Sequence, residues 1–153
     1  MIIFDLDGTL ADCEHRRHLV NGRSRGETPQ WDEFYRRCVY DEPIIPMVFT
    51  CKTMALAHNI EIWSGRSLAV LNETTEWLDK YLRFNGDMPA WNELRMRPVG
   101  DTTPDDQLKE RWLKEHAAAG KEPIDLVFDD RKKVVDMWRR NGIMCAQVAP
   151  GDF

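Results

Sequence analysis

The chain has 153 residues, a formal net charge of -5, 42% hydrophobic residues and 31% charged residues. This length suits one domain that buries a core without disulfides or a structural metal, and the composition excludes a disordered or fibrous chain. The negative charge gives no overall attraction to polyanions, which argues against a protein that coats nucleic acid and leaves open one that holds a single strand end.

The sequence shows no pattern of a membrane or secretory segment. No stretch approaches the ~18 apolar residues of a spanning helix, and Asp5 and Asp7 stand where a signal peptide needs an apolar run. The four cysteines lie far apart, with no CxxC pair and no histidine at zinc-finger spacing. We therefore expect a soluble cytoplasmic protein with reduced cysteines, no membrane contact and no implied stable protein partner, and the oligomeric state is open.

Short apolar runs alternate with helical patterns along the chain. The first run, residues 1–4, ends at an acidic turn that contains Gly8 and is typical of a buried parallel strand. Similar runs occur at residues 60–63, 94–96, 126–128 and 144–148, and helical patterns occur at roughly residues 46–58, 68–82, 105–117 and 131–141. The alternation predicts an α/β fold with a doubly wound parallel sheet and helices on both faces.

One segment, at about residues 11–46, breaks this alternation. It shows no good strand, and it contains an aromatic helix at about residues 31–40 and a basic patch formed by Arg16, Arg17, His18, Arg23 and Arg25. We predict that it is a small helical cap inserted after the first strand, over the carboxyl edge of the sheet, within a single domain of residues 1–153.

Several side chains of this segment allow two interpretations. Trp31, Phe34 and Tyr35 recur at helical spacing, so they either pack the cap onto the sheet or stack on a nucleobase. Trp63, outside the cap, is ambiguous in the same way. Asp41 is interpreted as a solvated surface residue.

Ligands bind at the carboxyl ends of the strands in an open α/β sheet. Four of the predicted strands end in polar residues: Asp5, Asp7 and Thr9 after the first, Ser64, Gly65 and Arg66 after the second, Arg97 with Asp105 and Lys109 after the third, and Asp129, Asp130 and Arg131 after the fourth. Parallel strands end at the same edge, so we expect one site.

The acidic residues of this set indicate a magnesium site. Asp5 and Asp7 lie two residues apart on an extended segment, so their carboxylates leave on the same side and repel each other unless a cation lies between them. Mg²⁺ prefers carboxylates, water and substrate phosphate as ligands. Asp129 and Asp130 would complete the ligand set.

The same residues suit phosphoryl transfer through a covalent intermediate. We expect Asp5 to attack phosphorus and Asp7 to give a proton to the leaving oxygen and later take one from water. Thr9 would help to orient Asp7, Ser64 and the backbone at Gly65 would hold phosphate oxygens, and Lys109 would balance the charge of Asp5 and the phosphoryl group.

The order DLDGT, SGR, lysine and DD resembles the haloacid dehalogenase superfamily of phosphatases. Residues 62–66, 100–109, 129–140 and 147–153 resemble, more closely, the 3′-phosphatase half of phage polynucleotide kinase-phosphatase. The kinase half has no counterpart here, because Met1 opens directly into the first strand. The longer aromatic cap and Pro104 depart from that pattern and affect substrate choice.

The resemblance implies a role for each matching residue. The nucleophile maps to Asp5 and the acid/base to Asp7, and Mg²⁺ ligation maps to Asp5, the Asp7 carbonyl and the pair Asp129 and Asp130. Contacts with phosphate or substrate map to Arg16, Ser64, Arg66, Arg97, Asp105, Lys109 and Arg131.

These observations lead to a magnesium-dependent phosphatase that removes 3′-phosphates from DNA or RNA ends. A nucleotidase that acts on free nucleoside monophosphates is the alternative within the same chemistry. A phospho-accepting receiver module is disfavoured because the DxD pair opens the chain and Asp7 would serve no purpose there, and a catalytically dead binding module is disfavoured because no expected catalytic group is missing. The choices between DNA and RNA and between 3′ and 5′ phosphates stay open.

Overall fold

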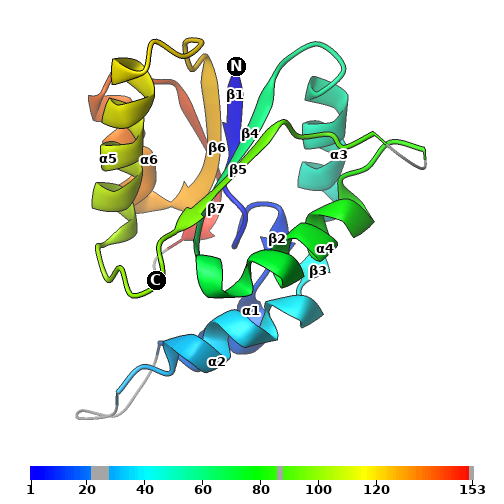
Figure 1. Cartoon of the computed structure of the whole chain (residues 1–153), viewed down its shortest axis with the longest axis vertical. Helices are drawn as coiled ribbons and strands as arrows, with labels where there is room; N and C mark the ends of the chain where they lie inside the picture. Colours follow the sequence, from blue (N-terminus) through cyan, green and yellow to red (C-terminus); the bar gives the residue numbers. More distant parts are fainter. Residues whose placement is uncertain (22–27, 86–87, 152–153) are drawn as a thin grey trace.

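The computed structural model describes residues 1–21, 28–85 and 88–151, which form a core sheet with its helices and a smaller cap (Figure 1). The core consists of β1 (Ile2–Phe4), α3 (Ile45–Met54), β4 (Ile60–Ser67), the 3-10 helix η2 (Leu68–Val70), α4 (Leu71–Tyr81), β5 (Glu93–Arg97), α5 (Asp105–Ala118), β6 (Leu126–Arg131), α6 (Lys132–Arg140) and β7 (Cys145–Gly151). The cap consists of β2 (Ala11–Asp12), α1 (Glu14–Arg17), α2 (Trp31–Arg36), the 3-10 helix η1 (Arg37–Tyr40) and β3 (Glu42–Pro43). Within these ranges, no helix has both the length and the apolar composition of a membrane span.

The core sheet is parallel throughout, with the strand order β5-β4-β1-β6-β7. In the central strand β1, Ile2 lies opposite Ile60 of β4 on one side and Leu126 of β6 on the other. The chain moves outward from β1 in one direction, returns to β6 and moves outward again, which confirms the doubly wound α/β fold. In such a sheet the carboxyl ends of β1 and β6 border the crevice where ligands bind.

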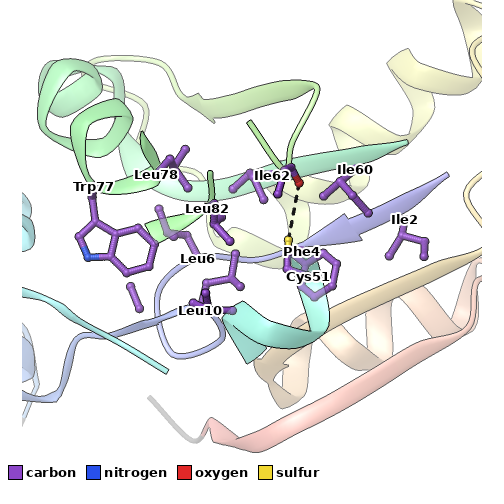
Figure 2. Close-up of a cluster of buried hydrophobic side chains, with 13 residues drawn as sticks. Ile2, Phe4, Leu6, Leu10, Cys51, Ile60, Ile62, Trp77, Leu78 and Leu82 are labelled. Carbon is purple, nitrogen blue, oxygen red and sulfur yellow. Dashed lines mark hydrogen bonds between the residues drawn. The ribbon is translucent and has the colours of Figure 1, made fainter. Parts of the chain in front are cut away.

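Alternating side chains of the strands fill two cores on opposite faces of the sheet. Ile2 and Phe4 of β1 pack with residues of α3 and α4, and this core is drawn in Figure 2 with Cys51 and Trp77. Met1 and Ile3 pack in the second core with residues of α5 and α6, and Figure 1 shows these two helices on the opposite side of the sheet from α3 and α4. The period-2 alternation thus gives each face of β1 its own helical layer.

Four tryptophans lie in these cores. Trp63, Trp112 and Trp138 are buried in the second core, where the ring centroids of Trp63 and Trp112 are 5.9 Å apart, and Trp77 is buried in the first. Trp63 therefore packs in the core instead of stacking on a nucleobase. Its Nε1 donates to Glu61 Oε2 at 2.7 Å, which satisfies its polar atom.

The cap lies beyond the carboxyl ends of the core strands, as predicted, and Figure 1 shows α1 and α2 below those ends. The expectation of no strand in this segment was wrong, because β2 and β3 form an antiparallel pair with Ala11 opposite Pro43. Each strand has only two residues, too few for an alternating pattern to be seen in the sequence. Residues 22–27, with Arg23 and Arg25 of the basic patch, and residues 152–153 lie outside the described residues.

Candidate active site

The floor of the site is formed by the ends of β1 and β6 together with α5. Lys109 of α5 is buried, and its Nζ donates to Asp5 Oδ1 at 2.6 Å and to Asp129 Oδ2 at 2.7 Å. Asp5 follows β1 directly, and its backbone N–H donates to Phe128 O of β6 at 2.9 Å. The structure therefore brings together the three residues that the sequence assigned to nucleophile, metal ligand and counter-charge.

Three buried carboxylates at this floor suit a divalent cation. One oxygen each from Asp5, Asp129 and Asp130 lie within 4.8 Å of one another. Asp130 Oδ1 is buried and has no hydrogen-bond partner in the described part of the chain, as expected for an oxygen that binds an ion. Gly8, at φ +86°, makes room for this carboxylate, because a Cβ there would overlap Asp130 Oδ2. The residues fit Mg²⁺.

The carboxylate of Asp7 is held by two arginines. Arg16 Nη2 donates to Asp7 Oδ1 at 2.7 Å, and Arg66 donates to the same oxygen from Nε at 2.8 Å and from Nη2 at 2.5 Å. Asp7 is not part of the carboxylate group that could hold an ion. The predicted cation between the carboxylates of Asp5 and Asp7 stays a prediction, and in this structure the carboxylate of Asp7 is bound by the two arginines.

Arg16 and Arg66 were predicted to contact phosphate, but both are fully buried and neither lines the cavity of the site. They bind Asp7 and also Asp41, whose Oδ2 accepts from Nη2 of each arginine at 2.6 Å. Each guanidinium group binds two carboxylates, which explains why both arginine side chains are buried. In this structure both arginines support Asp7, and their contact with phosphate stays a prediction.

Asp41 is the functional residue that the sequence interpretation missed, since it was assigned to the solvated surface. It is buried and accepts hydrogen bonds from Arg16, Arg66 and His15 Nε2, the last at 2.9 Å. The backbone carbonyl of Asp41 also accepts from Trp77 Nε1 of α4 at 2.7 Å. One sequence signal could have indicated an acidic residue of this kind. Two arginines were predicted at the site, and buried arginines need carboxylates as partners.

A cavity of about 430 Å³ opens above Asp5, Asp7 and Lys109, between the cap and the core. Arg97 and Arg131 line it, and both are ion-paired with the carboxylate of Asp105. Arg97 Nε also donates to Gly65 O at 2.9 Å. Asp105 was predicted to contact phosphate or substrate, and the structure shows that it holds two cations at the wall of the cavity.

The small polar residues of the motifs have different positions. Gly65 lines the cavity, and a Cβ there would lie 2.8 Å from Asp105 Oδ1, so only glycine leaves room for that carboxylate. Ser64 is buried outside the lining, and its Oγ accepts from Arg66 N at 3.2 Å. Thr9 Oγ1 is buried without a hydrogen-bond partner among the described residues, so its predicted orientation of Asp7 stays a prediction.

Burial and neighbouring charges set the pKa values of the site. Burial raises the pKa of Asp5 well above its ordinary value, an effect that Lys109 opposes and Asp129 and Asp130 strengthen. Burial, with the charge of Asp129, raises the pKa of Asp130 to about 7. For Asp7, burial acts in the same direction, but Arg16 and Arg66 outweigh it and lower the pKa to about 2. Asp7 is therefore ionised at neutral pH. Asp130 is partly protonated there unless a bound cation displaces the proton.

Such a site can bind a dianion and transfer it to a carboxylate. Lys109, Arg97 and Arg131 supply positive charge at the cavity, and the carboxylates of Asp5 and Asp7 line it. Positioning and charge stabilisation are what phosphoryl transfer requires from a protein.

Comparison with known proteins agrees with this chemistry. Residues 1–153 match the family described as the polynucleotide kinase PNKP phosphatase domain. A protein of Autographa californica nuclear polyhedrosis virus, assigned as a bifunctional polynucleotide kinase/RNA ligase, is 33% identical over 140 residues, which are 90% of this chain and 17% of the viral protein. The chain therefore spans only a part of this relative.

Solved structures give the same result. Chains from two structures of the Pnkp1/Rnl/Hen1 complex, one of them described as an RNA repair complex, are 31% and 32% identical and superpose with TM-scores of 0.75 and 0.70, over 99% of this chain and 46% and 43% of theirs. A haloacid dehalogenase-like hydrolase of Streptococcus pneumoniae, SP0104, is 14% identical with a TM-score of 0.62, over 94% of this chain and 81% of that one, which shows the shared fold. The resemblance predicted from the motifs is confirmed.

Proposed function

Because the chain belongs to the family of polynucleotide kinase PNKP phosphatase domains, we propose that it removes 3′-phosphates from DNA or RNA ends by a magnesium-dependent mechanism with an aspartyl-phosphate intermediate. The observation that carries this proposal is the position of Asp5, at the floor of a cation-lined cavity and bound to Lys109 at 2.6 Å. The substrates are phosphorylated nucleic-acid ends or nucleotides.

In the first step Asp5 attacks the phosphorus of the monoester. Lys109 binds Oδ1, so we assign the attack to Oδ2, which forms a bond to phosphorus while the bond from phosphorus to the ester oxygen breaks. Arg97 and Arg131 line the cavity and stabilise the negative charge of the phosphoryl oxygens. The leaving alkoxide takes a proton from Asp7 and departs as the free hydroxyl of the strand end.

In the second step Asp7 acts as a base. It takes a proton from water as the water oxygen attacks phosphorus, the bond from Asp5 to phosphorus breaks, and inorganic phosphate leaves. Asp7 carries no proton in the empty site, where Arg16 and Arg66 lower its pKa to about 2. An anionic phosphoryl group beside Asp7 raises that pKa, so substrate binding favours the protonated form that the first step needs.

Asp5, Asp129 and Asp130, with the Asp7 carbonyl, are the residues that would hold Mg²⁺. When bound, the ion would mask the charge of the phosphoryl oxygens and of the three carboxylates. The carboxylates themselves fix the nucleophile, because Asp5 and Asp129 are both tied to the single ammonium group of Lys109.

The cavity volume favours a second candidate function. About 430 Å³ is the size of a small-molecule pocket, so a free nucleoside monophosphate would also fit. A panel of 3′-phosphorylated oligonucleotides, 5′-phosphorylated oligonucleotides and 3′ and 5′ mononucleotides separates the two functions. Hydrolysis of the mononucleotides together with failure to act on the oligonucleotides would refute the polynucleotide phosphatase.

The covalent mechanism has its own test. Asp5→Asn should abolish turnover of every phosphomonoester in Mg²⁺ while the far-UV circular dichroism spectrum stays that of the wild type. Asp12→Asn is the matched control, because Asp12 is exposed at the end of β2. Near-normal activity of Asp5→Asn would exclude the aspartyl-phosphate.

A further inference from the structure

The cavity extends beyond the catalytic floor into a slot with two apolar walls. One wall is the cap helix α2, which contributes Trp31 and Tyr35. The other is the loop after β5, which contributes Pro98 and Val99. The mechanism described above uses neither wall.

The aromatic wall is already arranged as a stack. The rings of Trp31 and Tyr35 lie 5.9 Å apart with 29° between their planes, and Phe34 meets the ring of Trp31 edge-on. Phe34 itself is buried against the guanidinium of Arg16, whose Cζ lies 4.1 Å from its ring centroid. Phe34 therefore anchors the cap, and Trp31 and Tyr35 are the rings left for a ligand.

Large apolar side chains remain exposed on both walls. Trp31 is 45% exposed and Val99 is 70% exposed, although both line the same cavity. Exposed apolar surface that is concave and continuous with a catalytic centre is the usual sign of a ligand site. A planar ring between the two walls would extend the stack and bury both side chains.

The charges of the cavity separate a phosphate from the rest of its ligand. Lys109 binds Asp5 at the floor, and Arg97 and Arg131 are paired with Asp105 at the wall. The cap helix and the loop after β5 add the carboxylates of Asp32 and Asp101, and Asp101 is paired with Arg111. A second phosphate between the walls would meet the carboxylate of Asp32, whereas an uncharged ring meets no such repulsion. This charge distribution fits a terminal nucleotide with its phosphate on Asp5 and its base in the slot.

Resting on the proposed phosphatase function, we propose that the slot between Trp31 and Val99 holds the terminal nucleobase, unstacked from its neighbour. Contact with both faces of one base leaves no place for the next base pair, so the protein acts on unpaired strand ends in preference to blunt duplex ends. Recognition by stacking is tolerant of sequence, because every base has a π-face.

The test compares four substrates: a single-stranded oligonucleotide with a 3′-phosphate, the same strand in a blunt duplex, the same strand with an abasic terminal nucleotide, and 4-nitrophenyl phosphate. Loss of a stacked base should lower kcat/KM by about 5- to 100-fold for the duplex and the abasic strand. Trp31→Ala should reduce the ratio between the normal and the abasic strand toward one. Tyr40→Ala, an aromatic residue of the cap that is 72% exposed and outside the cavity lining, should preserve that ratio.

A binding measurement keeps this proposal separate from the proposed function. Asp5→Asn protein should bind the normal 3′-phosphorylated strand more tightly than the abasic strand, and the further change Trp31→Ala should remove the difference. Failure of the wild type to hydrolyse all four substrates would refute the phosphatase, and the binding ratio would still decide the slot. Equal affinity and equal kcat/KM for the normal and abasic strands would overturn the slot alone.

Discussion

Arg16 and Asp41 form a two-point ion pair in which neither side chain is exposed: Nε lies 2.8 Å from Oδ1 and Nη2 lies 2.6 Å from Oδ2. Arg66 also donates to Asp41 Oδ2, and both arginines donate to Asp7 Oδ1 as well. The four side chains thus form a largely buried cluster of two cations and two anions that includes Asp7, the residue proposed as acid/base. Its charges balance only when all four are present.

Asp41→Asn should therefore impair both stability and catalysis. Removing one partner of a buried ion pair leaves an uncompensated charge and costs about 3 kcal/mol of the free energy of unfolding. With Asp41 neutral, the two arginines draw on Asp7 alone, which should lower kcat. Urea unfolding and steady-state kinetics measure the two effects, and Glu42→Gln, at an exposed carboxylate next in the chain, is the control. Unchanged stability of Asp41→Asn would show that the cluster does not need this anion.

The same cluster makes stability depend on pH through Asp7. The pKa of Asp7 is lowered from the ordinary 3.8 to about 2, so the folded protein favours the ionised form. The resulting stabilisation is fully present above about pH 4 and is lost as the pH falls toward 2, and it amounts to about 2 kcal/mol. Asp7→Asn should remove this loss from urea-unfolding free energies measured between pH 5 and 2.5, while Asp136→Asn, at an exposed carboxylate of α6, should retain it. Equal pH slopes for wild type and Asp7→Asn would show that the ionisation of Asp7 does not stabilise the fold.

Asp130 makes stability depend on pH with the sign opposite to that of Asp7, and it makes the stabilisation by Mg²⁺ depend on pH as well. Its pKa is raised from 3.8 to about 7, so without metal the folded protein binds a proton that the unfolded protein has lost, and stability falls as pH rises through this window. A cation binds the ionised carboxylates, so the increase in Tm on adding Mg²⁺ should be small at pH 5 and large at pH 8. Asp130→Asn should reduce this increase. An increase in Tm of equal size at both pH values would argue against a metal on these carboxylates.

Lys109 holds Asp5 and Asp129 together, and its removal should make folding depend on metal. Lys109→Met leaves two buried carboxylates at the site without the cation that binds both of them in the wild type. We expect a loss of about 3 kcal/mol in EDTA and partial recovery in Mg²⁺, because the metal supplies the missing positive charge. Lys114→Met, at an exposed lysine of the same helix, is the control. Thermal unfolding in EDTA and in Mg²⁺ measures the difference, which would be absent if Lys109 served the substrate alone.

Much of the fold could be predicted because its signals are local. The continuous apolar run of residues 1–4 predicts a strand buried on both faces, and Ile2 and Ile3 lie in the two cores. The helical pattern at 105–117 anticipates α5 at Asp105–Ala118. The catalytic floor was equally accessible, because Asp5 and Asp129 each end a parallel strand and such strands end at one edge. Sequence position alone therefore brought the proposed nucleophile and the proposed metal ligands together.

The rest depended on contacts between residues far apart in the chain. Asp41 lies 25 residues from each of Arg16 and Arg66, and nothing local distinguishes it from the exposed Glu42 beside it. The buried position of both arginines follows from those contacts, so it could not be predicted from spacing. The strands β2 and β3, with two residues each, are held by pairing with one another, which no periodicity reveals.

Gly8 connects the backbone of the DxD turn with the metal site, and its replacement tests that connection. Gly8→Ala introduces a Cβ at φ +86° that would overlap the Asp130 carboxylate, so that side chain must move. Gly142→Ala is a matched control, because Gly142 has φ +78° and no atom within 4 Å of the added Cβ. Both changes cost the strain of a positive φ, about 1 kcal/mol, so the difference between them reports the overlap alone. We expect Gly8→Ala to lose further stability and to require a higher Mg²⁺ concentration for half-maximal activity, while Gly142→Ala keeps the wild-type requirement. The same Mg²⁺ requirement in both variants would mean that Asp130 does not bind the ion, since a ligand displaced from its position cannot leave the affinity unchanged.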